Sequence, residues 1–492
     1  MNMKKIMLYM AALMPLAFAS CLNDEGNYDY TELQTVEISG LPDQVRCVLL
    51  EDQNIVPQVK TAIPESQLEF IWRVGADTLC LTKALNYKFT EVPIGSDPLT
   101  FEVRDTKTNV RYAKYIDLTV VSPFTTGYAI LTDNGKLFFQ SFEAGNTLYK
   151  DLYKEVNGES LTGTPMAVKQ LRYQDGSTGA WGDRISVTMK GGKSPELDGL
   201  SMKLCKFYDD EFHTSTVPSL SYVTAQYYAA DKALDIITSD GQVYLKRVGS
   251  MGLPDDGYYE YPLVSSNATY RLAPCLARVT SNDADYIGFD EQNHCFVMWM
   301  GTNLSSVITP MNLGAEYANI PGRLVWIGCP LYNSTAYAIV DNGGKYMLYV
   351  MSYGYSYDVW DYVSTMEAAV ELPAGTVSNN SVFAANIVMS GYDVTTNYLF
   401  VGDGPNLKAI NLVNLSNIDD AIVDVATFDG DITDMHFDRD VNVLPTPEFS
   451  IAVSRASGSS VMQIDPTLVN KGAVLRRFDG IEGRIVSFCR KL

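Results

Sequence analysis

AILTDNGKLFF (residues 129–139) and DIITSDGQVYL (residues 235–245) contain the same features in the same order. Each begins with an apolar run, continues into an Asp- or Asn-containing turn that ends in glycine, and resumes as a second apolar run. Glycine and asparagine tolerate the positive φ angles that tight hairpin turns require. Each stretch therefore predicts a β-hairpin, and the recurrence predicts a repeated unit.

Hairpin-like units of this kind recur to the end of the chain. One apolar position in the first strand of each hairpin marks the unit: Ile130, Ile185, Ile236, Ile287, Ile339, Leu399 and Ile451. Neighbouring marks are 55, 51, 51, 52, 60 and 52 residues apart. A period near 50 with four short strands per unit is typical of a β-propeller blade. Residues 123–492 are therefore predicted to form a seven-bladed β-propeller, with six or eight blades, or an irregular array of β-sandwiches, as alternatives.

The two ends of this region predict how the ring closes. ITDMHF (432–437) precedes the seventh hairpin and is predicted to be the first strand of its blade. The first hairpin has no such strand before it, whereas GRIVSFCRKL (483–492) is a strand left over at the C-terminus. We expect this last strand to fill the missing place in the first blade, because an open ring would expose unpaired strand edges.

Residues 35–122 have a different pattern. They contain short runs with alternating apolar and polar residues, separated by Gly, Pro and Asp turns, such as LEFIWRV, LNYKFTEV and YIDLTVVSP. This pattern is typical of a small β-sandwich, in which Trp72 is expected to anchor the core. The chain also has 31 Tyr and 19 Phe and little helical periodicity, so the fold class predicted for the whole chain is all-β.

The N-terminus predicts an exported lipoprotein. Lys4 and Lys5 precede an apolar run at residues 6–18, which is shorter than the ~20 residues of a membrane-spanning helix. Ala19 and Ser20 then lead to Cys21, an arrangement that resembles a bacterial lipobox. Residues 1–20 are predicted to be a signal peptide and residues 21–34 a tether lipidated at Cys21, with an ordinary secreted protein as the alternative. Asp24 and Glu25 resemble the export signal of Bacteroidetes lipoproteins, which places the protein on the outer face of the outer membrane.

The net charge indicates which partners are unfavourable, and the cysteine positions indicate the state of the thiols. The chain has 37 basic and 58 acidic residues, a net charge of −21, which argues against nucleic acid and anionic headgroups as partners. Of the eight cysteines, Cys21 is assigned to the lipid. The other seven are far apart in strand-like settings, so we expect buried free thiols, with a Cys47–Cys80 disulfide as the alternative.

No motif in the sequence predicts a catalytic residue, a metal site or a cofactor. The three histidines, His213, His294 and His436, lack a second histidine at metal-ligand spacing. Asp438, Asp440 and Asn442 match the first three ligand positions of an EF-hand, but Val443 and Phe449 replace its Gly and Glu. Carboxylates are plentiful, so a surface hydrolase or lyase acting on peptide or polysaccharide at a propeller face stays an alternative function.

Two aromatic segments are the candidate ligand contacts. GYYEYPL (257–263) and YVMSYGYSYDVWDY (349–362) follow the glycine-containing hairpins of the third and fifth predicted blades. We expect both on one face of the ring, where flat aromatic side chains bind sugars or peptide side chains. The candidates are Tyr258, Tyr259, Tyr261, Tyr355, Tyr357 and Trp360. Packing between outer strands is the alternative.

The order of these segments resembles a known family. Cys21, Asp24 and the following GNYDY motif (26–30), then the Trp strand LEFIWRV and the LNYKFTEV strand, are similar to the PKD-like family lipoproteins of Bacteroidetes. The resemblance implies a non-catalytic accessory or binding subunit of a SusC/SusD-type TonB-dependent importer. Its partners would be the SusC-type transporter, the SusD-type lipoprotein and an oligomeric nutrient, either peptide or glycan.

Replacement of the lipidation residue tests the anchor. We expect Cys21→Ala to move the protein out of the membrane fraction, because the thiol is the only predicted attachment point for lipid. Fractionation of cells followed by immunoblotting measures this. A Cys21→Ala protein that still carries lipid and stays in the outer membrane would contradict the prediction.

Overall fold

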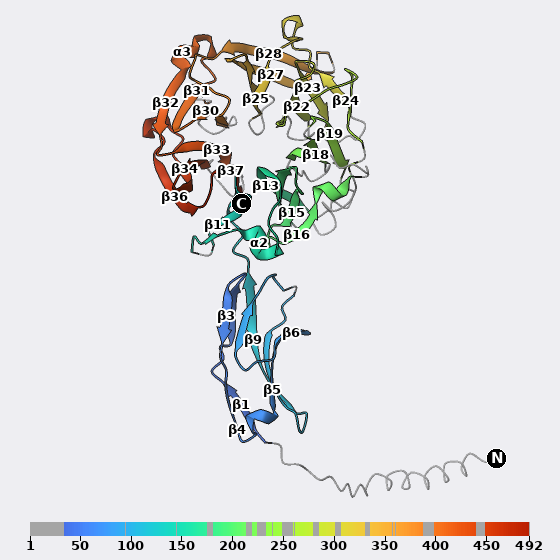
Figure 1. Cartoon of the computed structure of the whole chain (residues 1–492), viewed down its shortest axis with the longest axis vertical. Helices are drawn as coiled ribbons and strands as arrows, with labels where there is room; N and C mark the ends of the chain where they lie inside the picture. Colours follow the sequence, from blue (N-terminus) through green and yellow to red (C-terminus); the bar gives the residue numbers. More distant parts are fainter. Residues whose placement is uncertain are drawn as a thin grey trace, which may run out of the picture. The chain divides into compact units, whose positions relative to one another are not determined.

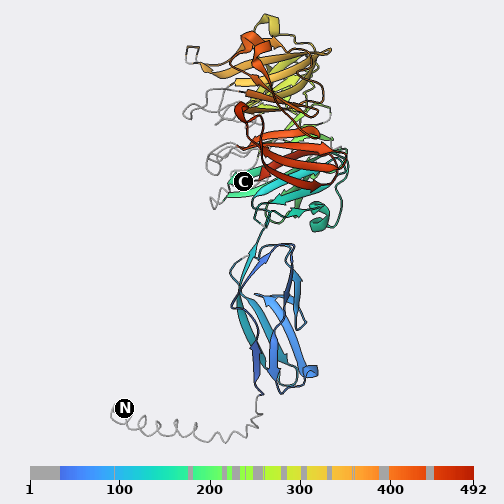
Figure 2. The same ribbon diagram turned by 90° about the vertical axis from the view of Figure 1, so that its left-hand side faces the viewer.

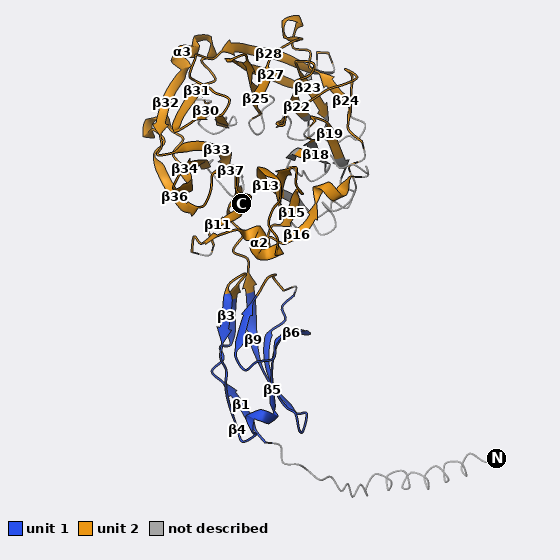
Figure 3. Cartoon of the chain, viewed as in Figure 1, with its two compact units in different colours: residues 1–46, 52–88, 95–119 blue, residues 47–51, 89–94, 120–492 orange. Residues whose placement is uncertain are grey.

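The computed structural model describes most of the chain after the predicted tether. The described residues are 34–93, 95–143, 145–174, 181–212, 219–223, 233–238, 240–247, 259, 261–278, 285–300, 307–329, 335–356, 358–359, 361–386, 398–438 and 448–491. The predicted signal peptide and Cys21 lie outside them. The chain divides into two compact units, one of residues 1–46, 52–88 and 95–119, the other of residues 47–51, 89–94 and 120–492 (Figure 3).

Unit 1 is a β-sandwich-like arrangement of one large and two small sheets. The five-stranded sheet has the order β2 (Gln44–Val48), β9 (Arg111–Val121), β8 (Leu99–Asp105), β5 (Leu68–Val74), β6 (Asp77–Cys80). The two-stranded sheets pair β1 (Val36–Ser39) with β4 (Gln58–Thr61) and β3 (Asp52–Ile55) with β7 (Leu85–Lys88). Trp72 is fully buried, lies 4.7 Å from Phe101 between ring centroids, and donates its indole N–H to the Lys83 carbonyl. This confirms Trp72 as a core anchor.

The alternative of a Cys47–Cys80 disulfide is wrong. Both thiols are free. Cys47 lies on β2 and Cys80 on β6, the two opposite edges of the five-stranded sheet. Four strand spacings of about 4.8 Å separate the two edges by roughly 19 Å, whereas a disulfide requires Cα atoms less than about 7 Å apart.

Among the described residues, unit 2 is a ring of seven sheets, antiparallel except for one parallel strand pair, which confirms the predicted propeller (Figure 1). Figure 2 shows the same ring from its side. The first sheet contains β37 (Ile485–Lys491), β10 (Gly127–Thr132), β11 (Leu137–Ser141) and β12 (Leu148–Tyr149). The second contains β13 (Thr164–Gln174), β14 (Trp181–Lys190), β15 (Pro195–Asp198) and β16 (Leu204–Phe207).

The remaining five sheets follow in chain order. The third has β17 (Leu220–Val223), β18 (Ala233–Thr238) and β19 (Val243–Arg247), and the fourth has β21 (Ala277–Arg278), β22 (Asp285–Asp290), β23 (Cys295–Met300), β24 (Val307–Pro310) and β20 (Val264–Ser265). The fifth has β25 (Arg323–Gly328), β26 (Thr335–Asn342), β27 (Lys345–Ser356) and β28 (Asp361–Glu371). The sixth has β29 (Val382–Asn386), β30 (Tyr398–Asp403), β31 (Asn406–Asn411) and β32 (Ile422–Thr427). The seventh has β33 (Asp431–Asp438), β34 (Glu448–Arg455), β35 (Gly458–Ile464) and β36 (Val474–Ile481).

Helices are short in the described part of the chain. The two α-helices are α2 (Leu152–Asn157) and α3 (Ile418–Ala421), and the 3-10 turns are η2 (Glu65–Gln67), η3 (Tyr208–Glu211), η4 (Ala315–Tyr317), η5 (Leu415–Asn417) and η6 (Leu468–Asn470). None of the described helices has the length and apolar composition that crossing a membrane requires.

The seven marker residues occupy equivalent positions in their sheets. Each lies on the second strand from the inner edge of its sheet, from Ile130 on β10 to Ile451 on β34. The expectation of four strands per sheet is met in five sheets. The third sheet has three described strands, and the fourth has five because β20 adds to its outer edge in parallel with β24.

The glycine turns of the first and third sheets have the same hydrogen-bond pattern. In the first, the Gly135 N–H donates to the Thr132 carbonyl (3.0 Å) and the Thr132 N–H to the Lys136 carbonyl (3.1 Å). In the third, Gly241 and Thr238 make the same two bonds, at 2.9 and 3.0 Å. Gly135 and Gly241 have φ angles of 75° and 78°, and a Cβ atom at Gly241 would lie 2.7 Å from the Leu272 nitrogen. Glycine is therefore required by backbone conformation and, at Gly241, by close packing.

The C-terminal strand closes the ring, as predicted. β37 pairs with β10 in antiparallel register from Gly127↔Lys491 to Thr132↔Ile485. It also contacts β13 of the second sheet and β33 of the seventh, and these three strands lie nearest the middle of the ring (Figure 1). The first strand of the first sheet is thus supplied by the last residues of the chain.

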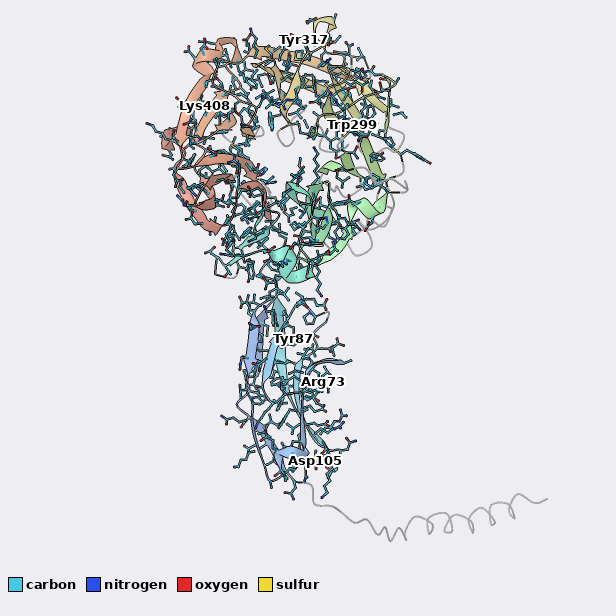
Figure 4. All side chains as sticks on the ribbon, in the orientation of Figure 1. Arg73, Tyr87, Asp105, Trp299, Tyr317 and Lys408 are labelled. Atoms are coloured by element: carbon cyan, nitrogen blue, oxygen red, sulfur yellow. The ribbon has the colours of Figure 1, made fainter. Side chains whose placement is uncertain are left out.

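Apolar side chains fill the spaces between neighbouring sheets. Trp299 of the fourth sheet is fully buried, stacks on Tyr286 at 5.5 Å, and belongs to a cluster with Val243 and Leu245 of the third sheet (Figure 4). Further clusters join the fourth sheet to the fifth, the fifth to the sixth, the sixth to the seventh and the seventh to the first. We call the last of these interfaces, between the strands of the seventh sheet and those of the first, the closure seam.

Truncation tests the closing strand. We expect deletion of residues 483–492 to abolish cooperative unfolding of the ring, because it leaves β10 with an unpaired edge and uncovers the closure seam. Differential scanning calorimetry measures this. An unchanged melting temperature would contradict the assignment.

A point substitution gives the matched comparison. Phe488 on β37 is fully buried against Tyr128 (5.7 Å), so Phe488→Ala should lower the free energy of unfolding by about 3–5 kcal/mol. Leu475 on β36 is exposed, so Leu475→Ala should have little effect.

Candidate functional site

The first predicted aromatic segment lies along the outer part of the ring. Tyr259 is fully buried, stacks on Phe212 at 4.9 Å, and donates its backbone N–H to the Glu211 carbonyl. Its ring is therefore not available to a ligand, and the packing alternative holds for this side chain. Tyr261 is 78% exposed, so its ring is accessible to a ligand, and ligand contact by this residue stays a prediction. Tyr258 lies outside the described residues.

This segment joins three sheets, which explains the burial of Tyr259. Tyr259 forms a parallel bridge with Phe212, next to the second sheet, and Pro262 forms an antiparallel bridge with Tyr244 of the third. Val264 then pairs in parallel with Val307 of the fourth sheet. Tyr259 and Pro262 therefore connect outer strands of neighbouring sheets.

The second aromatic segment forms the end of the β27–β28 hairpin. Tyr353 is buried in the cluster between the fourth and fifth sheets. Tyr355 pairs with Tyr362 across the hairpin, which places the two positions opposite each other. Tyr357 and Trp360 lie outside the described residues. Ligand contact by Tyr355, Tyr357 and Trp360 stays a prediction.

The structure adds a polar site that the sequence analysis did not assemble. On β33, the apolar residues Met435 and Phe437 belong to the cluster between the sixth and seventh sheets. The residues that alternate with them, Asp434, His436 and Asp438, therefore lie on the opposite face of the sheet, toward the closure seam. We call these three side chains, together with Glu448 of β34 and Arg490 of β37, the inner seam cluster.

Asp434 connects the seventh sheet to the closing strand. One oxygen, Oδ2, lies 2.9 Å from His436 Nε2 and also accepts the backbone N–H of Phe488 at 2.9 Å. The His436 ring packs edge-on against the Phe488 ring at 4.9 Å. Because the His436 side chain is still 41% exposed, solvent reaches this end of the seam.

The charges of the cluster shift its protonation equilibria. Partial burial opposes the charged form of His436, but the Asp434 carboxylate and then Asp438 outweigh burial and raise the pKa of the imidazole. Burial raises the pKa of Asp438 to about 6, although the positive charges of His436 and Arg490 act in the other direction. Asp438 Oδ2 accepts no hydrogen bond from the described residues. A buried carboxylate oxygen in this state is typical of functional sites.

A hydrogen-bond network extends from the cluster into the seam. Arg490 Nε lies 3.2 Å from Glu448 Oε2, which also accepts the Gln463 side-chain amide at 2.8 Å. The same amide donates to the Tyr128 hydroxyl at 2.9 Å, and that hydroxyl is paired with Ser450 Oγ at 2.7 Å. These bonds satisfy the buried Tyr128 hydroxyl and hold β10, β34, β35 and β37 in one register.

Among the described residues, the His436 imidazole pairs with a carboxylate and not with a hydroxyl or thiol. A catalytic triad requires a hydroxyl or thiol that hydrogen-bonds to the imidazole. Within the described part of the chain, His436 pairs with Asp434, whereas the nearby Ser450 hydroxyl pairs with Tyr128. The described residues also contain no group of three or more side chains placed to hold a metal ion. The cluster combines both signs of charge with two side chains, His436 and Asp438, whose pKa values are raised.

The two other histidines and the EF-hand-like residues Asp440 and Asn442 do not belong to the inner seam cluster. His294 lies in the β22–β23 turn with a φ angle of 54°, and His213, Asp440 and Asn442 lie outside the described residues. The signal for the inner seam cluster was the polar–apolar alternation of DMHFD (434–438) in a predicted inner strand. Its partner, Arg490, comes from the closing strand.

Comparison with known proteins supports the two-part architecture. A family model described as the PKD-like family matches residues 21–165, which include unit 1 and extend into the second sheet of the ring. No curated protein matches the sequence of this chain.

Solved structures resemble the chain at low sequence identity. A quinonprotein alcohol dehydrogenase-like protein from Bacteroides thetaiotaomicron is 12% identical, with a TM-score of 0.50 over 94% of this chain and 100% of that chain. A protein from Lactobacillus plantarum is 9% identical, with a TM-score of 0.45 over 74% and 99%. Sqt1 from Saccharomyces cerevisiae is 11% identical, with a TM-score of 0.42 over 74% and 87%. The first likeness shows the fold alone, whereas the PKD-like assignment of residues 21–165 comes from the family model.

The raised pKa of Asp438 predicts a pH-dependent effect of Asp438→Asn. Well below pH 3.8, the ordinary pKa of an aspartate, the carboxyl is protonated in both the folded and the unfolded protein, so the substitution should change stability little. As pH rises towards 6, ionisation occurs more readily in the unfolded chain, and the wild-type fold loses stability relative to Asp438→Asn. Melting temperatures from pH 4 to pH 8 should show a difference that grows and then levels off above about pH 6.

An exposed carboxylate of the same ring provides the comparison. Asp424→Asn on β32 removes one exposed carboxylate. Its melting-temperature difference from the wild type should not grow between pH 4 and pH 6 as that of Asp438→Asn does. If the Asp438→Asn curve runs parallel to wild type at every pH, the folded state does not disfavour ionisation of Asp438.

Proposed function

We propose that the protein is a non-catalytic cell-surface lipoprotein that captures an oligomeric nutrient for a SusC/SusD-type TonB-dependent importer. The observation that carries the proposal is the joining, in one chain, of a PKD-like match at residues 21–165 with a closed ring of seven sheets. The lipobox-like sequence at Cys21 would anchor the chain to the outer membrane.

The ring has the features of a binding module. Its sheets are buried against one another by clusters that run from the third sheet to the first across the closure, so the outer loops project from a rigid scaffold. The exposed Tyr261 provides an aromatic side chain on which sugars or peptide side chains can pack. The net charge of −21 disfavours nucleic acid as the ligand.

Isolation of the native complex tests the partners. The protein would be crosslinked in intact cells, solubilised with mild detergent and captured through a C-terminal affinity tag joined by a flexible linker. We expect the SusC-type transporter and the SusD-type lipoprotein among the captured proteins. Capture without either would contradict the importer role. Product release from a peptide or polysaccharide panel by the purified protein would favour the alternative, a surface hydrolase or lyase.

Substitution of the hairpin aromatics tests ligand capture. We expect simultaneous replacement of Tyr355, Tyr357 and Trp360 by Ala to weaken capture at least tenfold, because aromatic anchors contribute on the order of 2 kcal/mol each and ~1.4 kcal/mol is one decade. Calorimetric titration with the co-purifying peptide or glycan measures the affinity. Tyr115→Ala, which removes an exposed aromatic side chain from unit 1, is the matched control. Equal affinities of wild type and triple variant would exclude this hairpin from the site.

A further inference from the structure

A second polar site lies at the outer end of the closure seam. A cavity of about 450 Å³ is lined by Gln140, Asn146, Leu148, Arg476, Arg477, Phe478 and Asp479. The first three residues lie on β11, on β12 and in the turn between them, and the others on β36. The first and seventh sheets therefore form this cavity together. The hollow is open to solvent, and its volume is within the range of small-molecule sites.

Arg476 has no carboxylate partner among the described residues. Its nearest polar contact is Asn146 Oδ1, 3.5 Å from Nη2. The neighbouring Arg477 forms ion pairs with two carboxylates: its Nε lies 2.8 Å from Asp479 and its Nη2 lies 3.5 Å from Asp429. One guanidinium in the cavity is thus neutralised and the other is free to pair.

Aromatic rings hold the Arg476 guanidinium in place. Its central carbon lies 4.8 Å from the ring centroid of Phe142 and 5.3 Å from that of Phe478. The two rings stack on each other at 5.3 Å with an interplanar angle of 23°. A guanidinium fixed on aromatic faces keeps its N–H edges available for a planar acceptor and loses less entropy when it binds one.

The charge balance of the cavity favours a single negative charge. Asp479 also lines it, and Arg477 offsets that carboxylate, so Arg476 leaves one unpaired positive charge. A dianion such as phosphate would experience repulsion from Asp479 and from a chain with a net charge of −21. A carboxylate matches the planar fork of one guanidinium and carries one charge.

We propose that this cavity binds the carboxylate group of a ligand through Arg476, with the Asn146 side chain as a second polar contact. The carboxylate belongs either to an acidic sugar or to a peptide C-terminus. The inference relies on the proposed function only in taking the ligand to be an oligomeric nutrient. It is tested on purified protein without importer components, so failed transporter capture and failed carboxylate binding are separate results.

Four probes separate the sources of the carboxylate. Galacturonate and trialanine each carry one carboxylate, whereas galactose and trialanine amide are the matched compounds without it. We expect calorimetry to show wild-type binding of at least one carboxylate probe, at least tenfold tighter than its counterpart and weakened by added NaCl. Failure of both carboxylate probes to bind, or equal binding of probe and counterpart, would overturn the proposal.

Two variants test the role of Arg476 and one controls for charge. Arg476→Gln should weaken binding of the carboxylate probe at least tenfold. Asn146→Asp places a carboxylate beside the intact guanidinium and should weaken it similarly; aspartate tolerates the positive φ angle of 60° at this position. Arg271→Gln removes an exposed guanidinium in the loop before the fourth sheet and should leave the affinity within twofold. Unchanged affinity in the folded Asn146→Asp protein, even if Arg476→Gln does not fold, would overturn the proposal.

Discussion

The ring depends on the pairing of its last strand with the first strand of its first hairpin. In a ring of sheets, each sheet buries its two faces against its neighbours, so one missing strand uncovers two faces and an unpaired edge. β37 prevents this by pairing with β10 through six residue pairs, and its residues also bond to both neighbouring sheets. Asp434 of the seventh sheet accepts a hydrogen bond from the Phe488 backbone N–H. On the other side, the Lys491 ammonium group, whose side chain is 1% exposed, lies 2.8 Å from the Asp183 carboxylate of the second sheet. The pair forms in the observed register, in which Lys491 lies opposite Gly127 of β10.

The closure seam has different chemistry at its inner, middle and outer parts. Its middle is apolar, with Ile130, Val461 and Phe488 fully buried. Its inner end carries the titratable inner seam cluster, and its outer end carries the Arg476 cavity. The apolar middle stabilises the closed ring, and the polar ends, which are less deeply buried, are where the chain can contact a ligand without losing core packing. A ligand that binds residues of both sheets at the outer end binds only the closed ring, so its binding free energy adds to the stability of closure.

Features repeated along the chain could be predicted from the sequence, and features that arise from single long-range contacts could not. The marker positions predicted seven sheets because each hairpin repeats the same alternation, and the surplus strand at 483–492 predicted the closure. The segment 257–263 is rich in tyrosine and therefore predicts a ligand loop. Two isolated bridges and the short β20–β24 pairing that follows them have no periodic signal in the sequence. The inner seam cluster was missed for a related reason. Its alternation is visible in DMHFD, but its meaning depends on Arg490, which lies more than 50 residues later.

The position of β10 links closure to the predicted anchoring of the chain. The polypeptide leaves unit 1 through β9, which ends at Val121, and enters the ring at β10, which begins at Gly127. Any tension on the chain between a membrane tether and the ring therefore acts first on β10. This strand is hydrogen-bonded on both sides, to β37 and to β11, and its Tyr128 hydroxyl is bonded to Ser450 and Gln463 of the seventh sheet. A strand at the edge of a sheet could separate by breaking one row of hydrogen bonds, whereas β10 must break two rows and the seam network together. The C-terminal strand thus holds in place the same strand through which an N-terminal anchor would pull, and the ring resists opening at the point where the load enters.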